Sequence, residues 1–211
     1  MAKKRKTSPV PFRFRGLELD EFQKQAIWYL QRNTSTLVCA PTGTGKTLIA
    51  DYLVDITLKQ EKRVIFTAPI KALVNQKYQE FSRRFGRERV GIVTGDVSEN
   101  KYASLVVMTT EVYRNMLLRG EPHPDIQWVI FDEIHYLDHP ERGTVWEEAI
   151  MLVPRSVGIL GLSATIPNAQ EIAAWIETVH RPIAVVSHTK RAVPLAHLYF
   201  NERTQAVTRD E

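Results

Sequence analysis

Residues 38 to 47 read Val38-Cys39-Ala40-Pro41-Thr42-Gly43-Thr44-Gly45-Lys46-Thr47. This is the phosphate-loop pattern G-x-x-x-x-G-K-[ST], except that Ala40 stands where the first glycine usually does. Residues 36–39 form a short apolar, partly β-branched run that predicts a buried strand before the loop. The apolar spacing of residues 48–55 predicts a helix after it. A strand, a glycine-containing loop and a helix start are the context in which this pattern binds phosphate.

The residue types of this loop indicate its chemistry. Gly43 and Gly45 allow backbone N–H groups to approach an anion closely, and the N-terminus of the following helix adds unpaired donors and the positive end of its dipole. We expect Lys46 to reach the β- and γ-phosphates, and the Thr47 hydroxyl to bind the accompanying Mg²⁺. The loop therefore predicts a site for a nucleoside triphosphate. The remaining loop residues that we expect to bind the nucleotide are Pro41, Thr42 and Thr44.

The composition is that of a soluble globular protein. The chain has 211 residues, of which 44% are hydrophobic and 25% charged, enough for one large domain. The net charge of +4 permits a nucleic-acid partner without requiring one. Part of this excess lies in the run Lys3-Lys4-Arg5-Lys6. That run predicts a solvated tail, with a localisation signal or a phosphate-binding arm as alternatives.

Cysteine content and apolar runs bear on the compartment. Cys39 is the single cysteine, so no intrachain disulfide forms, and its place at the end of a strand favours a packing role over a nucleophilic one. No apolar run approaches the roughly 18 residues that span a bilayer. The basic N-terminus lacks the apolar segment of a signal peptide. We expect a soluble, intracellular protein, cytoplasmic or nuclear, with no membrane contact.

Strands and helices alternate along the chain. We expect strands at residues 36–39, 63–67, 90–93, 105–108, 127–131, 157–162, 183–186 and 195–200. Helices are expected at residues 20–31, 48–55, 73–85 (introduced by Pro69), 111–118, 145–152 and 169–178. This alternation predicts an α/β fold with a mainly parallel sheet and helices on both faces. We expect one domain at residues 12–200, between a flexible basic tail at 1–11 and a polar end at 201–211.

A carboxylate follows another hydrophobic strand, as a phosphate-bound metal requires. In Val129-Ile130-Phe131-Asp132, the aspartate is placed to hold Mg²⁺ directly or through water. Glu133 is then placed to orient and polarise the attacking water. An aspartate that only caps the next element is the alternative, and the pairing with a phosphate loop favours the metal site.

The string Asp132-Glu133-Ile134-His135 resembles the DExH signature of superfamily 2 helicases, and further stretches agree in order and spacing. Residues 40–47 resemble the first motif of this superfamily, which commonly begins with alanine. Ser163-Ala164-Thr165 is similar to the S-A-T motif that couples nucleotide state to strand movement. The resemblance implies a RecA-like P-loop fold, ATP as the nucleotide, and a coupling role for His135, for which a structural histidine is the alternative.

Three stretches resemble elements with which these helicases contact a nucleic-acid backbone. They are Thr67-Ala68-Pro69-Ile70-Lys71-Ala72-Leu73, Thr94-Gly95-Asp96 and Met108-Thr109-Thr110-Glu111. The contacts that the resemblance implies are Pro69, Lys71, Ala72, Thr94, Gly95, Thr109 and Thr110. The cations Arg83, Arg84 and Arg87 are further candidates for a phosphate-binding surface, with a solvated helix end as an equal alternative.

Other stretches narrow the resemblance. Residues 142–148 and 190–195 resemble stretches of the superkiller-type, exosome-associated RNA helicases. These helicases also have the sequence L-D-x-F-Q before the first motif, as this chain does at residues 19–23. The resemblance implies that Gln23 reads the adenine edge, and it favours RNA over DNA as the single-stranded partner. The family often has a base-stacking aromatic a few residues earlier, where this chain has Leu17. The nearby Phe14 or Phe12 is the candidate to stack on the base in its place. Trp146 is expected in the core, with a base-stacking platform as the alternative.

Phosphoryl transfer needs positive charge beyond Lys46 and Mg²⁺, typically an arginine finger. In the helicases that this chain resembles, the arginine comes from a second RecA-like lobe. We therefore expect the first motor lobe of a longer helicase, which binds ATP with little turnover alone. The alternatives are a DNA helicase of the same superfamily, a self-sufficient P-loop ATPase or kinase, and a non-catalytic binding module. An arginine supplied in cis near the nucleotide would favour the self-sufficient enzyme.

Overall fold

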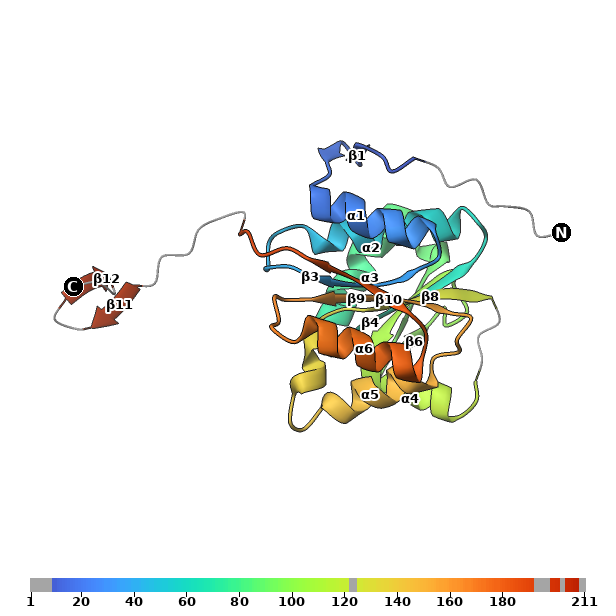
Figure 1. Ribbon diagram of the computed structural model, residues 1–211. Helices are drawn as coiled ribbons and strands as arrows, with labels where there is room; N and C mark the ends of the chain where they lie inside the picture. Colours follow the sequence, from blue (N-terminus) through green and yellow to red (C-terminus); the bar gives the residue numbers. More distant parts are fainter. Residues whose placement is uncertain (1–8, 122–124, 192–197, 202–203, 209–211) are drawn as a thin grey trace.

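The fold is known from a computed structural model, which describes residues 9–121 and 125–191 and the backbone of residues 198–201 and 204–208. An eight-stranded sheet forms its centre, in the order β10-β3-β9-β8-β4-β7-β5-β6 (Figure 1). All neighbouring strands are parallel except the pair β5 and β6. This confirms the predicted mainly parallel sheet. Its strands are β3 (Ser35–Cys39), β4 (Arg63–Ala68), β5 (Val90–Val93), β6 (Ser98–Glu99), β7 (Leu105–Thr109), β8 (Ile126–Phe131), β9 (Gly158–Ser163) and β10 (Ile183–Ser187).

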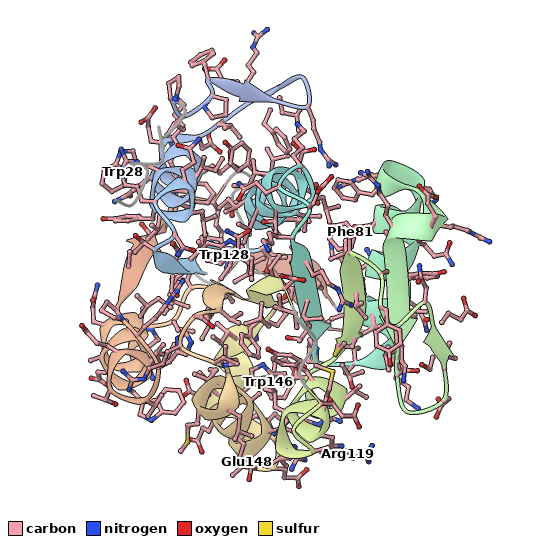
Figure 2. The ribbon with its side chains drawn as sticks, turned by 90° about the vertical axis from the view of Figure 1, so that its right-hand side faces the viewer. Trp28, Phe81, Arg119, Trp128, Trp146 and Glu148 are labelled. Atoms are coloured by element: carbon pink, nitrogen blue, oxygen red, sulfur yellow. The ribbon has the colours of Figure 1, made fainter. Side chains whose placement is uncertain are left out.

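Helices cover both faces of the sheet, as predicted. One face is covered by α1 (Glu21–Gln31), α2 (Lys46–Leu58) and α3 (Lys71–Phe85). The other is covered by α4 (Thr110–Leu118), α5 (Gly143–Leu152) and α6 (Ala169–Val179). Figure 2 shows the two helical layers on either side of the strands.

Alternation along the strands explains the two layers. In β8, Trp128 and Ile130 pack against the first helical layer, whereas Val129 and Phe131 pack against the second. Because successive side chains of a strand point to opposite faces, a strand covered on both sides is apolar throughout. Trp146 of α5 is fully buried in the second layer, which confirms its predicted place in the core.

The helix starts differ from the predicted ones by a few residues. Helix α2 begins at Lys46 because Gly45, in the left-handed region at φ 82°, is its N-cap. Helix α3 begins at Lys71, with extended Ile70 as its N-cap, so Pro69 lies in the preceding loop. The capping loops, which apolar periodicity does not mark, decide these starts.

Several short elements were not predicted. The hairpin of β1 (Arg13–Phe14) and β2 (Leu17–Glu18) precedes α1. The 3₁₀ helices are η1 (Arg87–Arg89) and η2 (Ile134–Asp138). Strand β11 (Leu198–Asn201) pairs with β12 (Thr204–Thr208), so the polar end contains a strand. The expected final strand at residues 195–200 is observed at 198–200 as part of β11, and its residues 195–197 lie outside the described residues. Elements of two or three residues, such as β1, β2 and η1, are too short for periodicity to reveal.

Burial decides the state of Cys39. Its side chain is 2% exposed and packs in the second layer. Burial raises the pKa of its thiol to about 11, against a smaller opposing effect of Lys46. A thiol in this environment is a poor nucleophile, which supports the predicted packing role.

None of the helices within the described residues has the length and apolarity needed to cross a membrane.

Candidate nucleotide and nucleic-acid sites

The carboxyl ends of the parallel strands carry the predicted site residues. Parallel strands end at one edge of a sheet, where ligands of such folds bind. Following the strand order along this edge, the phosphate loop after β3 comes first, then Ser163 of β9 and Asp132 after β8. Pro69 after β4, Thr109 of β7 and Thr94 after β5 come next. The predicted nucleotide residues therefore lie toward one end of the edge and the predicted nucleic-acid residues toward the other.

The phosphate loop closes on itself through Lys46. The Lys46 amine donates to the carbonyl oxygens of Ala40 and Pro41 at 2.6 and 3.1 Å. The Thr44 hydroxyl also donates to the Pro41 carbonyl, at 2.7 Å. Gly43, at φ 84°, would meet nothing within 4 Å if it carried a Cβ, so backbone conformation rather than space requires glycine there. The loop is therefore preformed, with open space above it.

Gln23 ties α1 to this loop. Its Nε2 donates to the carbonyls of Thr44 and Gly45 at 3.3 and 3.1 Å, and its Oε1 accepts from the backbone N–H of Asp20 at 2.9 Å. The side chain is buried, and both ends of its amide have partners within the chain. Reading of an adenine edge by Gln23, as the resemblance implies, therefore requires an exchange of these bonds.

A cavity of about 480 Å³ opens beside the loop. Leu17, which is 58% exposed, lines it, whereas Phe12 and Phe14 do not. The ring of Phe14 instead packs edge-on against Tyr52. The lining residues are Leu17, Glu18, Asp20, Gln23, Gly43, Thr44, Gly45, Leu48, His188, Lys190 and Arg191.

The cations of this cavity were missed as site residues. The sequence marks Lys190 and Arg191 only as part of residues 190–195, which resemble a stretch of the superkiller-type helicases. Nothing local connects them to residues about 150 positions earlier, and the parallel pairing of β10 with β3 brings the two segments together.

The two acids follow β8 in a constrained turn. The backbone N–H of Asp132 donates to the Thr67 carbonyl at 2.9 Å, and that of Glu133 donates to Oδ1 of Asp132 at 3.1 Å. Glu133 has a left-handed backbone at φ 53°, a conformation that non-glycine residues adopt at a cost and that is often found at functional sites. The turn therefore holds both carboxyl groups at the end of the strand.

The charges of these two acids affect the pKa of Lys46, and the charge of Lys46 affects the pKa of Asp132. Burial, together with the charge of Glu133, raises the pKa of Asp132 to about 6, against smaller opposing effects of Lys77 and Lys46. Burial lowers the pKa of Lys46, against the opposing charges of Glu133 and Asp132. An amine from the phosphate loop and two carboxylates thus share one partly buried environment, which is suited to a phosphate with a metal ion.

The predicted coupling residues lie beside these groups. The backbone N–H of Ala40 donates to the carbonyl of Ser163 at 3.2 Å, so β9 is bonded directly to the start of the phosphate loop. The Ser163 hydroxyl is buried and has no hydrogen-bond partner among the described residues. His135 Nδ1 lies 3.3 Å from Glu133 Oε2. Ala164 is half-buried and Thr165 exposed at the start of the following loop.

A groove of about 610 Å³ lies farther along the same edge. Of the predicted nucleic-acid contacts, Pro69, Lys71, Ala72, Gly95 and Thr109 line it. Thr94 and Thr110 do not. The Thr94 hydroxyl accepts from the N–H groups of Asp96 and Val97, so it shapes the turn, and Thr110 is fully buried as the first residue of α4. We call this cavity the first groove.

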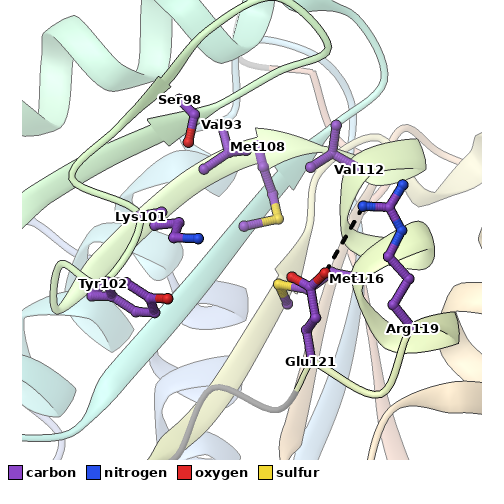
Figure 3. Close-up of a pocket in the computed structure, with 9 residues that line it drawn as sticks. All are labelled: Val93, Ser98, Lys101, Tyr102, Met108, Val112, Met116, Arg119 and Glu121. Atoms are coloured by element: carbon purple, nitrogen blue, oxygen red, sulfur yellow. Dashed lines mark ion pairs between the residues drawn. The ribbon is translucent and has the colours of Figure 1, made fainter.

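Charged groups in the first groove include a cation that was missed. Lys71 forms an ion pair with Asp96, and both side chains are more than half exposed. Arg142, which precedes α5, is exposed and lines the groove together with Asn115. The sequence marks Arg142 only through a stretch of family resemblance, and the fold brings it into one groove with Lys71. Val112 is shared with a second groove next to the first (Figure 3).

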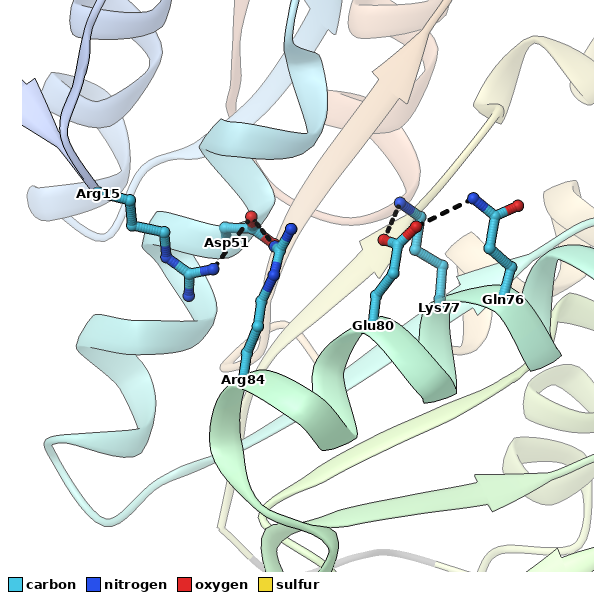
Figure 4. Close-up of polar contacts among 6 residues, drawn as sticks. All are labelled: Arg15, Asp51, Gln76, Lys77, Glu80 and Arg84. Atoms are coloured by element: carbon cyan, nitrogen blue, oxygen red, sulfur yellow. Dashed lines mark hydrogen bonds and ion pairs between the residues drawn. The ribbon is translucent and has the colours of Figure 1, made fainter.

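Arg84 is exposed but already paired with an acid of the chain, so its part in a phosphate-binding surface stays a prediction. It pairs with the buried Asp51 of α2, which Arg15 also contacts at 3.4 Å (Figure 4). Arg84 lies in the last turn of α3, about 20 Å along the helix axis from Lys71. Arg83 and Arg87 are exposed at the same end and do not line the first groove.

Comparison with known families decides the classification. The model of the "DEAD/DEAH box helicase" family matches residues 20–172, most of the described fold. The chain belongs to the DEAD/DEAH box helicase family. Membership implies the use of ATP, and it accounts for a phosphate loop and a DExH turn on one sheet edge.

Relatives of this DEAD/DEAH box domain confirm the superkiller-type resemblance. The mouse protein "Exosome RNA helicase MTR4" is 50% identical over 184 residues, which are 86% of this chain and 18% of that protein. The human "Superkiller complex protein 2" is 48% identical over 187 residues, which are 88% of this chain and 15% of that protein. The chain thus spans less than a fifth of the length of these relatives.

Solved structures confirm the RecA-like helicase fold. The helicase domain of Pyrococcus furiosus Hef matches with a TM-score of 0.61 at 26% identity, over 79% of this chain and 38% of that chain. The helicase MrfA bound to DNA matches with a TM-score of 0.69 at 21% identity, over 81% and 27%, and supports the fold alone.

Proposed function

We propose that this chain is the first motor lobe of an ATP-dependent RNA helicase, which couples ATP hydrolysis to movement along single-stranded RNA and to unwinding. The observation that carries the proposal is the order of functional groups along one sheet edge. The phosphate loop follows β3, the first groove surrounds the ends of β4, β5 and β7, and the strands β9 and β8 lie between them. A change at the nucleotide therefore reaches the groove through adjoining strands.

RNA is the preferred partner in this proposal because several relatives with about half of their residues identical are named RNA helicases. The first groove offers the cations Lys71 and Arg142 to a phosphate backbone. The ion pair between Lys71 and Asp96 is exposed, so it is weak and a phosphate can replace the carboxylate. The remaining predicted contacts, including the backbone at Gly95 and Thr109, stay part of this proposal.

The residues at the nucleotide fit Mg²⁺ as the accompanying metal. The Thr47 hydroxyl and the Asp132 carboxylate are oxygen ligands of the kind that this ion prefers. Burial is the largest cause of the raised pKa of Asp132, and a cation bound beside the carboxylate would oppose that effect. When bound, the ion neutralises charge on the β- and γ-phosphate oxygens. Lys46 would then leave the Ala40 and Pro41 carbonyls for the phosphates, and Glu133 would orient the attacking water.

We also propose that hydrolysis needs an arginine from a second lobe, and that the protein acts in the interior of the cell.

The proposed function is tested on the lone chain by measuring ATP turnover and oligonucleotide binding, with RNA and DNA of one sequence. We expect RNA to bind more tightly than DNA, because the 2′-hydroxyl adds a donor and an acceptor. We expect turnover to stay below about 1 s⁻¹, the low end of enzyme turnover numbers, with or without RNA. RNA-stimulated turnover that is lost in Lys46→Ala would instead show a self-sufficient motor.

Arg191 provides a specific reason to test the self-sufficient ATPase as a second candidate, because it is an arginine in cis beside the loop. Its cavity contains Gln23 and Leu17 but neither Asp132 nor Glu133. We therefore expect Arg191 to contact the base or ribose side of the nucleotide. Arg191→Ala should weaken the binding of ATP and ADP alike by about 10-fold, the value of one charged hydrogen bond. Loss confined to ATP would place the arginine at the γ-phosphate and favour the second candidate. Arg83→Ala, an exposed arginine outside the cavity, is the control.

A further inference from the structure

A second groove, of about 560 Å³, lies beside the first and has no place in the function proposed above. It opens between the β5–β6 hairpin, the loop before β7, and helix α4 with the turn after it (Figure 3). Val112 belongs to both grooves, so they are adjoining rather than separate features. The lining residues are Val93, Ser98, Lys101, Tyr102, Met108, Val112, Met116, Arg119 and Glu121.

The second groove combines an apolar floor with two cations and an exposed aromatic ring. Figure 3 shows Met108 between a side that carries Lys101 and Tyr102 and a side that carries Arg119 and Glu121. Tyr102 is 69% exposed, a high value for a side chain that would remove much apolar surface from water if buried. The Lys101 amine lies 5.0 Å from the centroid of the Tyr102 ring.

The charges of the second groove leave its cations accessible. Arg119 approaches Glu121 at 3.9 Å, the outer limit of an ion pair, and both side chains are more than half exposed. Such a pair contributes little, so a phosphate can displace the carboxylate. With Lys101 and Arg119 against Glu121, the groove carries a net charge of about +1, which favours an anionic ligand.

We propose that the second groove is a subsite for single-stranded RNA, which takes up nucleotides that leave the first groove at Val112. The ring of Tyr102 stacks on a base, and Lys101 and Arg119 contact the neighbouring phosphates. An aromatic platform between cations is the general means by which proteins hold single strands without reading sequence. This inference rests on the proposed function, because continuity with the first groove is what identifies RNA as the occupant.

The test compares oligouridylates of increasing length with this chain and its variants. An oligomer of about four nucleotides can fill only the first groove, whereas one of about ten reaches both. Tyr102→Ala should bind the short oligomer as the unmodified chain does and bind the long one at least about five-fold more weakly, the loss of one stacked base. Tyr102→Phe should retain the binding of the long oligomer. Lys101→Ala and Arg119→Ala should each reduce its salt dependence.

Two controls separate this inference from the proposed function. Lys71→Ala should weaken both lengths, because it removes a cation of the first groove. Trp28→Ala removes an exposed aromatic side chain of α1 that lines neither groove, and it should change nothing. If Lys71→Ala weakens binding while Tyr102→Ala leaves every length unchanged, the second groove is not an RNA subsite and the proposed function stands. If the unmodified chain binds no oligomer, both proposals fail.

A second readout localises the strand directly. Long oligomers that carry a photoreactive base at one end should crosslink to the peptide that contains Tyr102 or to the one that contains Met116. Short oligomers should crosslink only around the first groove. Crosslinks of the long oligomer confined to the first groove would overturn the inference and leave the second groove to a protein partner.

Discussion

Lys46→Ala is expected to weaken the binding of Mg-ATP to this chain by at least about 100-fold, which corresponds to about 2.7 kcal/mol. The Lys46 amine already lies over the loop, bonded to the Ala40 and Pro41 carbonyls. It shares a partly buried environment with Asp132 and Glu133. A charged hydrogen bond contributes about 1.5–3 kcal/mol, and an amine that meets two phosphate groups makes more than one. Equilibrium titration with a fluorescent ATP analogue measures the change.

The control for Lys46→Ala is Lys59→Ala. Lys59 directly follows α2, where its side chain is 72% exposed and paired with Asp55 at 2.7 Å. An exposed pair of this kind contributes little, so ATP affinity and stability should stay within about two-fold and 0.5 kcal/mol of the unmodified chain. Retention of ATP affinity in Lys46→Ala to within about three-fold would contradict the assignment of residues 40–47 as the nucleotide loop.

Trp146→Ala is expected to have the largest effect on stability, lowering the free energy of unfolding by about 3–5 kcal/mol. Trp146 is fully buried in the second helical layer (Figure 2). The centroid of its ring lies 5.4 Å from that of Tyr136 in a stacked arrangement. Removing the indole leaves a cavity beneath η2, the segment that carries His135. The midpoint of thermal unfolding should fall by about 6–20 °C, given about 2–4 °C per kcal/mol for a domain of this size.

Urea unfolding of Trp146→Ala beside Trp28→Ala measures this difference. Trp28 is 43% exposed on α1, so its replacement removes the same side chain type with little loss of burial. We expect Trp28→Ala to cost about 1 kcal/mol or less. Equal losses of stability in the two variants would show that the indole of Trp146 is not the packing centre of the second layer.

The sequence by itself determined which short segments carry the site residues and where the strands lie. The phosphate loop at residues 40–47 and the acids Asp132 and Glu133 are read from contiguous residues, because a turn between a strand and a helix depends on its neighbours in the chain. The apolar strands were located for the same reason, since a strand that is buried on both faces is apolar along its whole length. Helix starts at Lys46 and Lys71 depend on capping conformations that the apolar pattern does not reveal.

Only the tertiary structure decided which distant residues share a site. Strand order places Ser163 between the phosphate loop and Asp132, and it brings Arg191 to the loop and Arg142 to Lys71. An ion pair between α2 and α3 joins the exposed Arg84 to the buried Asp51, a contact that the sequence around Arg84 does not reveal. These placements depend on the pairing of strands far apart in the chain, and pairing is set by the packing of the whole sheet rather than by any local pattern.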